Sequence, residues 1–168
     1  METSVVTGGH MLLCPLVLYG HGSSDSNYDL SSYEEIMKIQ TVEELIVLNE
    51  TLSDIIIKYH MLFLMRDGIQ PTYEDPMNID GGRFSLKFAD TNIVYCWKLL
   101  TYLFAGNQLS LHPEIAAKIT GITISPKKKC CIAKIWMKTC EHQNPDLLNL
   151  KALEEFNSIS SFFTKHEP

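Results

Sequence analysis

Apolar and polar positions alternate along several stretches of the chain, and this spacing predicts the strands of an antiparallel sheet. Residues 11–19 are nearly all apolar and predict a buried strand. In residues 83–88, apolar side chains alternate with Arg, Ser and Lys, which predicts a strand with one buried face. Residues 119–125 and 131–138 predict two strands joined by a lysine-rich turn, and residues 158–165 predict a last short strand.

The segment after Thr41 has the spacing of a helix. Thr41 and Glu44 stand in the positions of a capping box, in which each residue's side chain satisfies the other's backbone N–H. The apolar positions that follow at helical spacing are Leu45, Leu48, Leu52 and Ile55. Residues 55–66 are rich in β-branched and apolar side chains, so they predict a strand directly after this helix.

Two more main helices are expected. Asp90 or Thr91 can cap the second helix, and Gly106 ends it. Its apolar stripe consists of Ile93, Cys96, Trp97, Leu100, Leu103 and Phe104. The third helix is expected to begin at Asn144, with Pro145 in its first position. Its apolar positions are Leu147, Leu148, Leu150, Leu153 and Phe156.

Antiparallel strands interleaved with three helices indicate an α+β fold. We expect a single domain over residues 1–168, with residues 1–12 as a short N-terminal tail. Helices that cover one face of a sheet leave its other face free to hold a ligand. Residues 67–82 contain several glycine and proline breaks and predict a long ordered loop, a kind of segment that often carries function.

The formal net charge of the chain is -6 at pH 7. A protein that coats nucleic acid nonspecifically is usually basic, because neutralisation of phosphate dominates that affinity. The charge therefore argues against that class of protein. It remains compatible with a protein that grips one chemical feature of a nucleic acid in a local pocket.

The five cysteines do not form a recognisable framework. Their number is odd and no C-x-x-C pair occurs, so we expect reduced cysteines in a cytosolic or nuclear setting. The apolar run at residues 11–19 is too short to span a bilayer and lacks the charged start of a signal peptide. The sequence shows neither metal-ligand spacing nor a nucleophile–base pair, so we expect no metal, no cofactor and no enzyme.

One segment resembles the cap-binding translation initiation factor 4E family. Residues 67–75 read D-G-I-Q-P-T-Y-E-D and residues 81–84 read G-G-R-F. The family pattern is D-G-I-x-P-x-W-E-D followed by G-G-R-W, at the same spacing. Further matches are the T-V-E that begins at Thr41, Trp97 with Gly106, and the segment from Gly121 to Trp136. The resemblance implies a curved antiparallel sheet backed on its convex face by three helices, with a cap pocket on the concave face.

The resemblance also implies how 7-methylguanine, which carries a delocalised positive charge, would be held. Two aromatic faces sandwich the base, a carboxylate reads its Watson–Crick edge, and basic side chains hold the phosphates. Tyr73 stands at the second stacking tryptophan, Glu74 at the guanine-reading carboxylate, and Arg83 at a phosphate-side arginine. Lys127 stands at another phosphate-binding arginine, and Trp136 at a tryptophan near the methyl group. The implied cap-binding residues are Tyr28, Tyr73, Glu74, Arg83, Lys127, Lys128, Lys129 and Trp136.

Several of these assignments have alternatives. The first stacking residue is Tyr28 by alignment from Leu16, with Tyr33 as the competitor. Arg83 can instead form a structural ion pair with Asp67 or Asp75, the three lysines can form a solvated turn, and Trp136 can be part of the core.

Two departures from the family pattern concern the strength of binding. Tyrosine is a poorer cation–π partner than tryptophan, so we expect weaker cap affinity than in a typical member. The family lysine near the phosphates aligns with Ile132, so the run Lys127, Lys128 and Lys129 must compensate.

The family also binds partner proteins on its convex helical face. The corresponding positions here are Val42, Ile46, Lys98, Tyr102 and Gly106. Ile46 replaces a tryptophan, and Lys98 and Tyr102 replace leucines. We therefore expect a Y-x-x-x-x-L-φ peptide, from a scaffold factor of the 4G type or a 4E-binding protein, to bind weakly or through altered contacts.

The main functional prediction is a monomeric cytoplasmic protein, with the nucleus as an alternative further location, that binds capped messenger RNA for translation initiation. Neither a membrane nor DNA is expected as a partner. Two alternatives stay open: a cap-binding repressor or specialised isoform, and a partner-binding protein that has lost cap binding. Retention on a cap resin separates the last from the others.

Overall fold

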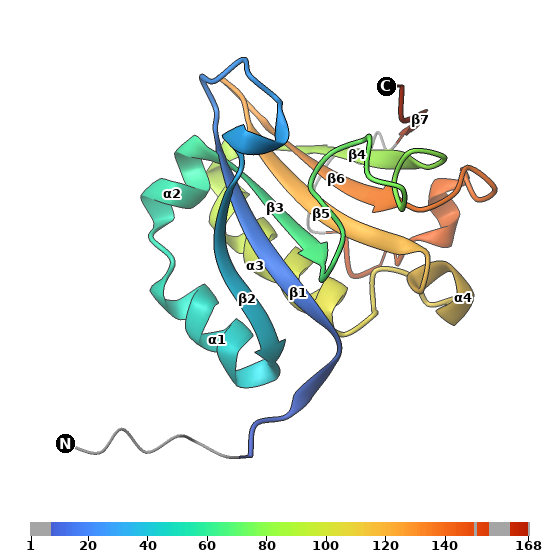
Figure 1. Ribbon diagram of the computed structural model, residues 1–168, viewed down its shortest axis with the longest axis horizontal. Coiled ribbons are helices and arrows are strands. Elements are labelled where there is room, and N and C mark those ends of the chain that lie inside the picture. Colours follow the sequence, from blue (N-terminus) through green and yellow to red (C-terminus); the bar gives the residue numbers. More distant parts are fainter. Residues whose placement is uncertain (1–7, 150, 155–161, 168) are drawn as a thin grey trace.

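A computed structural model describes residues 8–149, 151–154 and 162–167. Within these residues, seven strands form one antiparallel sheet in the order β2-β1-β3-β5-β6-β4-β7 (Figure 1). The strands are β1 (Met11–Gly22), β2 (Glu34–Thr41), β3 (His60–Arg66), β4 (Gly82–Phe88), β5 (Ile119–Pro126), β6 (Cys131–Met137) and β7 (Phe162–Lys165). The expected α+β fold with an antiparallel sheet is therefore confirmed.

Helices cover one face of this sheet. The α-helices are α1 (Val42–Thr51), α2 (Asp54–Tyr59), α3 (Ile93–Ala105) and α4 (Pro113–Ala116), and the 3-10 turns are η1 (Leu30–Ser32), η2 (Asp90–Asn92) and η3 (Pro145–Leu147). The expected capping box is present at α1, where the Glu44 backbone N–H donates to Thr41 Oγ1 and the Glu44 carboxylate accepts from the Thr41 N–H.

The main hydrophobic core lies between the helices and one face of the sheet. Leu16 and Leu18 of β1 point into it, together with Leu48 of α1 and Trp97 of α3. Burying apolar surface of this kind provides the main favourable term for folding. A second, smaller cluster lies on the opposite face of the sheet; its buried members are Val17, Tyr19, Met61, Phe63, Met65, Ile69 and Trp136.

The G-G-R segment begins at Gly81 and leads into strand β4, which lies between β6 and β7. A Cβ atom added to Gly81 would collide with the carbonyl oxygen of Met137, and one added to Gly82 would collide with the Phe163 ring. This close approach explains why two glycines precede Arg83. In the resulting register, Arg83 pairs with Trp136 on β6 and with Thr164 on β7.

The strand expected over residues 55–66 is wrong in its first half. Residues 54–59 form α2, and β3 begins only at His60. Ser53 caps α2, since its Oγ accepts a hydrogen bond from the Ile55 N–H, and Ile57 is fully buried in the main core. Capping and core burial thus outweigh the weak strand preference of the β-branched run. The first helix ends at Thr51, so Ile55 does not belong to it.

Two helix starts also differ from expectation. Asp90 lies in η2, and α3 begins at Ile93 after Asn92, so neither Asp90 nor Thr91 is its N-cap. At Pro145 the chain forms only the 3-10 turn η3.

Parts of three other predictions fall outside the described residues. Leu150 and Phe156 of the expected third helix lie there, as do residues 158–161 of the expected last strand. Of the expected tail at residues 1–12, residues 1–7 lie outside the description, and β1 already begins at Met11.

Candidate functional site

The loop between β3 and β4 is held in shape by buried polar side chains. The Asp75 carboxylate accepts hydrogen bonds from the backbone N–H groups of Gln70 and Met77, each at 2.8 Å. Two such bonds within one loop stabilise its turns, as expected for an aspartate that bonds its own neighbourhood. Asp75 is therefore occupied by the loop itself, whereas the adjacent Glu74 is left to face the pocket described below.

Asn78 anchors the same loop to the sheet. Its side chain is fully buried, and its Nδ2 donates to the carbonyl oxygen of Thr72 at 2.9 Å. Its Oδ1 accepts from the hydroxyl of Thr120 on β5 at 2.8 Å. Since buried polar groups are costly unless they are paired, these bonds fix the backbone immediately before Tyr73.

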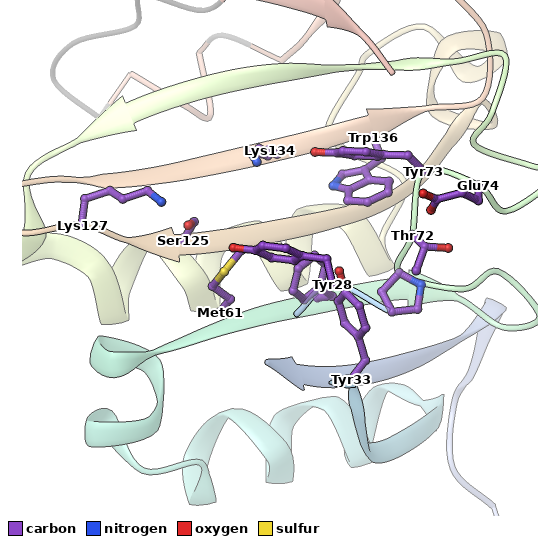
Figure 2. Close-up of a pocket in the computed structure, with 12 residues that line it drawn as sticks. Tyr28, Tyr33, Met61, Thr72, Tyr73, Glu74, Ser125, Lys127, Lys134 and Trp136 are labelled. Atoms are coloured by element: carbon purple, nitrogen blue, oxygen red, sulfur yellow. The ribbon is translucent and has the colours of Figure 1, made fainter. Parts of the chain in front are cut away.

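A cavity of about 250 Å³ opens on the face of the sheet away from the main core. It is lined by Tyr28, Tyr33, Met61, Phe63, Pro71, Thr72, Tyr73, Glu74, Ser125, Lys127, Lys134 and Trp136. Figure 2 shows the rings of Tyr28 and Tyr73 on opposite sides of this space. Glu74 lies toward one end, and Lys127 and Lys134 lie toward the other. The cavity thus combines two aromatic walls with one negative and one positive end.

Both candidates for the first stacking residue line the cavity. The Tyr28 ring is stacked on the His21 ring, with centroids 4.9 Å apart and an interplanar angle of 5°, and Tyr28 is 56% exposed. Tyr33 is packed more deeply, with its ring centroid 5.2 Å from that of Phe63 in an edge arrangement. Burial is the main cause that raises the pKa of Tyr33 to about 12. Of the two rings, Tyr28 therefore has the more accessible surface.

Tyr73 lies in a group of rings and one cation. Its ring centroid is 4.5 Å from that of His166, in a stacked arrangement, and 5.0 Å from that of Trp136. The guanidinium carbon of Arg83 lies 4.9 Å from the centre of the Tyr73 ring. Burial raises the pKa of Tyr73, while the charge of Arg83 opposes that rise.

Trp136 is a core residue and a cavity residue at once. It is 2% exposed, and its Nε1–H donates to the Thr123 hydroxyl at 2.9 Å. Its ring nevertheless lines the space between Tyr28 and Tyr73. The indole is therefore held rigidly by its hydrogen bond and can offer only a small part of its surface to a ligand.

Lys134 also lines the cavity, although it is not among the cap-binding residues predicted from the sequence. It stands on β6 two residues before Trp136, so both side chains point to the same face of the sheet. Burial, and then the charges of Arg83 and Lys127, lower its pKa from 10.5 to about 8. The alternation of Ala133 and Ile135 into the core was the signal that could have identified it.

Three of the expected phosphate-side residues lie elsewhere. Lys128 and Lys129 are not among the residues that line the cavity; they follow Lys127 in the turn between β5 and β6. Arg83 borders a neighbouring cavity of about 260 Å³, which shares Lys134 with the first. Within the described residues, Arg83 forms no ion pair with Asp67 or Asp75; Asp67 pairs instead with Lys38 at 2.8 Å.

The expected partner-binding positions lie on the helical side. Val42, Ile46 and Tyr102 are exposed, as is Gly106 at the C-cap of α3, and Lys98 is half-buried. A buried hydrogen bond of 2.8 Å from Asn49 to Thr101 joins α1 to α3 beneath this surface.

Two absences hold for the part of the chain that the structure describes. No helix in this part is both long and apolar enough to cross a bilayer. The same residues also contain no cluster of His, Cys, Asp and Glu side chains that could hold a metal ion.

Residues 17–160 match the protein family described as eukaryotic initiation factor 4E. The chain belongs to this family. Over 97 residues it is 32% identical to a eukaryotic translation initiation factor 4E homolog of Acanthamoeba polyphaga mimivirus, covering 58% of this chain and 35% of that one. Over 108 residues it is 29% identical to the translation initiation factor NCBP of Oryza sativa subsp. japonica, covering 64% and 46%. The chain thus spans less than half the length of these curated relatives.

Solved structures of initiation factor 4E proteins have the same fold. The chain superposes with a TM-score of 0.78 and 18% identity on Ascaris suum eIF4E-3 with m7G cap, over 95% of this chain and 93% of that one. For a Schistosome eIF4E complexed with m7GpppG and 4E-BP, the TM-score is 0.79 at 20% identity, over 95% and 90%. The family resemblance inferred from the motifs is confirmed, and membership in this family of initiation factors agrees with the expectation of a non-enzymatic protein.

Proposed function

We propose that this chain binds the 7-methylguanosine cap of messenger RNA for translation initiation, in the cavity between Tyr28 and Tyr73. The observation that carries this proposal is the arrangement of the cavity, with two tyrosine rings on opposite sides, Glu74 toward one end and lysines toward the other. Family membership supports it, as do the cap-bound structures of Ascaris and Schistosome proteins that share the fold.

The two tyrosines provide the attraction for a methylated base. Methylation at N7 gives guanine a positive charge, and the electron-rich faces of Tyr28 and Tyr73 attract a cation placed between them. Such cation–π contacts contribute about 0.5–2 kcal/mol each, and more when water is excluded. Tyrosine is weaker than tryptophan in this role, so the affinity should lie below that of relatives with two tryptophans.

Glu74 gives the pocket its preference for guanine. Its carboxylate can accept hydrogen bonds from both the ring N–H and the exocyclic amine of the base, while Asp75 is already bonded within the loop. Trp136, held by its hydrogen bond to Thr123, lines the cavity, where its accessible edge could contact the methyl group.

The phosphates of the cap would extend from the base toward the lysine end of the cavity. Lys127 and Lys134 line that end, and Arg83 borders the adjoining cavity that shares Lys134. Lys134 thus supplies a cation in place of the family lysine that Ile132 replaces. Lys128 and Lys129 contribute positive charge from the neighbouring turn.

We also propose a partner surface on α1 and α3, formed by Val42, Ile46, Lys98, Tyr102 and Gly106. It would bind a scaffold initiation factor or a 4E-binding protein in the cytoplasm. The solved Schistosome structure contains a 4E-BP together with the cap analogue. Ile46 has a smaller side chain than the tryptophan that the family has at this position, so scaffold binding should be weaker. The second candidate function is therefore a repressor or specialised isoform that binds the cap but recruits a scaffold poorly.

The test is equilibrium binding of the whole chain to m7GTP and to GTP. We expect m7GTP to bind at least about tenfold more tightly, because only the methylated base is a cation. Equal binding, or no retention on an m7GTP resin, would contradict the proposal and favour a partner-binding protein that has lost cap binding. Pull-down of a scaffold factor on the same resin separates an initiation factor from a repressor.

A further inference from the structure

Of the three tyrosines that line the cavity, the two proposed to stack on the base are each backed by a buried histidine. His21 is stacked on Tyr28 at 4.9 Å with an angle of 5°, and His166 is stacked on Tyr73 at 4.5 Å with an angle of 25°. The two histidines are only 2% and 6% exposed. They come from opposite ends of the chain, His21 from β1 and His166 from the residue after β7.

Each imidazole is also hydrogen-bonded to the loop that carries its tyrosine. His21 Nε2 donates to the carbonyl oxygen of Asn27, the residue directly before Tyr28, at 2.7 Å. His166 Nδ1 donates to the carbonyl oxygen of Asn78 at 2.8 Å. The Asn78 side chain in turn binds the carbonyl oxygen of Thr72, directly before Tyr73. Each histidine therefore holds both the ring and the backbone of its tyrosine.

The hydrogen bonds determine the form of both imidazoles. A carbonyl oxygen can only accept, so His21 Nε2 and His166 Nδ1 carry the proton. The other ring nitrogens, His21 Nδ1 and His166 Nε2, are buried and have no hydrogen-bond partner in the described part of the chain. A second proton at His166 Nε2 would be buried without an acceptor, and burial lowers the pKa of His166, so the neutral form fits that site. A neutral ring leaves the electron density of the tyrosine face undiminished.

We propose that His21 and His166 are positioning residues for cap binding, each holding one tyrosine ring against the cavity wall. This inference rests on the proposed function. Tyrosine has a smaller π surface than tryptophan, and an unsupported exposed ring would lose rotamer freedom when a base stacks on it. A stacked, hydrogen-bonded imidazole removes that freedom before the ligand arrives, which is preorganisation of the site. This preorganisation offsets part of the cap affinity that is lost by having tyrosine in place of tryptophan at both stacking positions.

Four variants separate the ring of each histidine from its hydrogen bond. His21→Gln and His166→Asn place an amide donor near the position of the bonding nitrogen but remove the ring. His21→Phe and His166→Phe keep a ring but remove the donor. His60→Gln is the matched control, because His60 is exposed at the start of β3.

The readout is the ratio of the affinities for m7GTP and GTP, measured on variants whose circular dichroism matches the wild type. A residue that only stabilised the fold would change both affinities together. We expect the ratio to fall by about threefold to tenfold in His21→Gln and in His166→Asn, the range of one aromatic pair. His60→Gln should keep the wild-type ratio.

An unchanged ratio in both folded amide variants would overturn the inference. Should these variants unfold, the phenylalanine pair decides: retention of the wild-type ratio supports the role of the stacked ring, and its loss refutes it. A wild type without any preference for m7GTP would refute the proposed function and the inference with it. A wild-type preference that every variant keeps would refute the inference alone.

Discussion

The guanidinium of Arg83 lies 4.9 Å from the centre of the Tyr73 ring. Arg83 was expected at the phosphate side, and it does border the cavity next to Lys134, but it also contacts the stacking tyrosine. A single cation thus links the aromatic wall of the proposed site to its phosphate end.

We expect Arg83→Gln to weaken m7GTP binding by about tenfold, the loss of one charge-assisted contact. Binding of m7GMP, which has a single phosphate, should weaken less. Titration of both nucleotides measures the difference, with Lys58→Gln on α2 as a control for the loss of one positive charge. Equal losses for the two nucleotides would mean that Arg83 acts only through Tyr73.

Lys134 makes m7GTP binding sensitive to alkaline pH. Its pKa is lowered to about 8, so raising the pH from about 7 to about 9 removes its charge and weakens attraction for the phosphates. Loss of the N–H proton of 7-methylguanine acts in the same direction. The contribution of Lys134 is therefore the difference between the pH profiles of wild type and Lys134→Met. We expect the affinity of Lys134→Met for m7GTP to fall less steeply with rising pH than that of the wild type. Parallel pH profiles would contradict the placement of Lys134 against the phosphates.

The same lysine should affect the stability of the fold in the opposite direction, because its contribution to the free energy of unfolding should rise with pH. In the unfolded chain its pKa returns to 10.5, so between about 8 and 10.5 the unfolded state binds more protons than the folded state. Stability contributed through this group therefore rises with pH across that window. We expect the difference in melting temperature between Lys134→Met and the unliganded wild type to narrow as the pH rises. A constant difference would show that Lys134 is not desolvated.

Asn78 should matter for the fold as well as for the site. Removal of its side chain takes the donor from the part-buried carbonyl of Thr72 and the 2.8 Å acceptor from the buried Thr120 hydroxyl. We expect Asn78→Ala to reduce the free energy of unfolding by about 2–3 kcal/mol, because unpaired buried groups lose their solvation. Urea unfolding measures this loss. Asn92→Ala, whose side chain makes no capping hydrogen bond to α3, should change it little.

The small side chain at Ile46 should limit partner binding. We expect Ile46→Trp to tighten binding of a Y-x-x-x-x-L-φ peptide by about fivefold or more, because aromatic side chains dominate such interfaces. Val47→Trp is the control, since Val47 is an exposed neighbour on the same helix. Peptide affinity is measured by fluorescence anisotropy. Equal changes in affinity for the two variants would show that the peptide does not contact the surface around Ile46.

The strands could be predicted from the sequence because successive side chains of a strand alternate between the main core and the opposite face of the sheet. In β4, Phe84, Leu86 and Phe88 enter the main core, while Arg83 and Lys87 stand on the other side. This alternation is a direct consequence of strand geometry and is visible in a short window. The capping box at Thr41 was visible for the same reason, because its partners lie within one turn.

The helix α2 could not be predicted from local preference. Its sequence contains three consecutive isoleucines, which favour a strand, whereas Ile57 becomes buried in the core that distant segments complete. Over the described residues, the third expected helix is replaced by the 3-10 turn η3 and a turn at residues 151–154, although Pro145 suits a helix start equally well.

The candidate site was predicted in part. The loop motif identified Tyr73 and Glu74, which both line the cavity. The contacts of His166 with Tyr73 depend on the pairing of β7 with β4, far apart in sequence, so no local pattern shows them. Lys134 was overlooked because a family alignment directs attention to Ile132, while strand alternation places Lys134 beside Trp136.

Cap binding in this cavity depends most on Glu74, the residue proposed to read the guanine edge. Its direct test is titration of wild type and Glu74→Ala with m7GTP, followed by tryptophan fluorescence, with Glu50→Ala on the exposed surface of α1 as the control. We expect Glu74→Ala to lose about tenfold or more in affinity, as for two charge-assisted hydrogen bonds, and Glu50→Ala to match the wild type. Equal affinity of wild type and Glu74→Ala would contradict the assignment of the cap to this cavity.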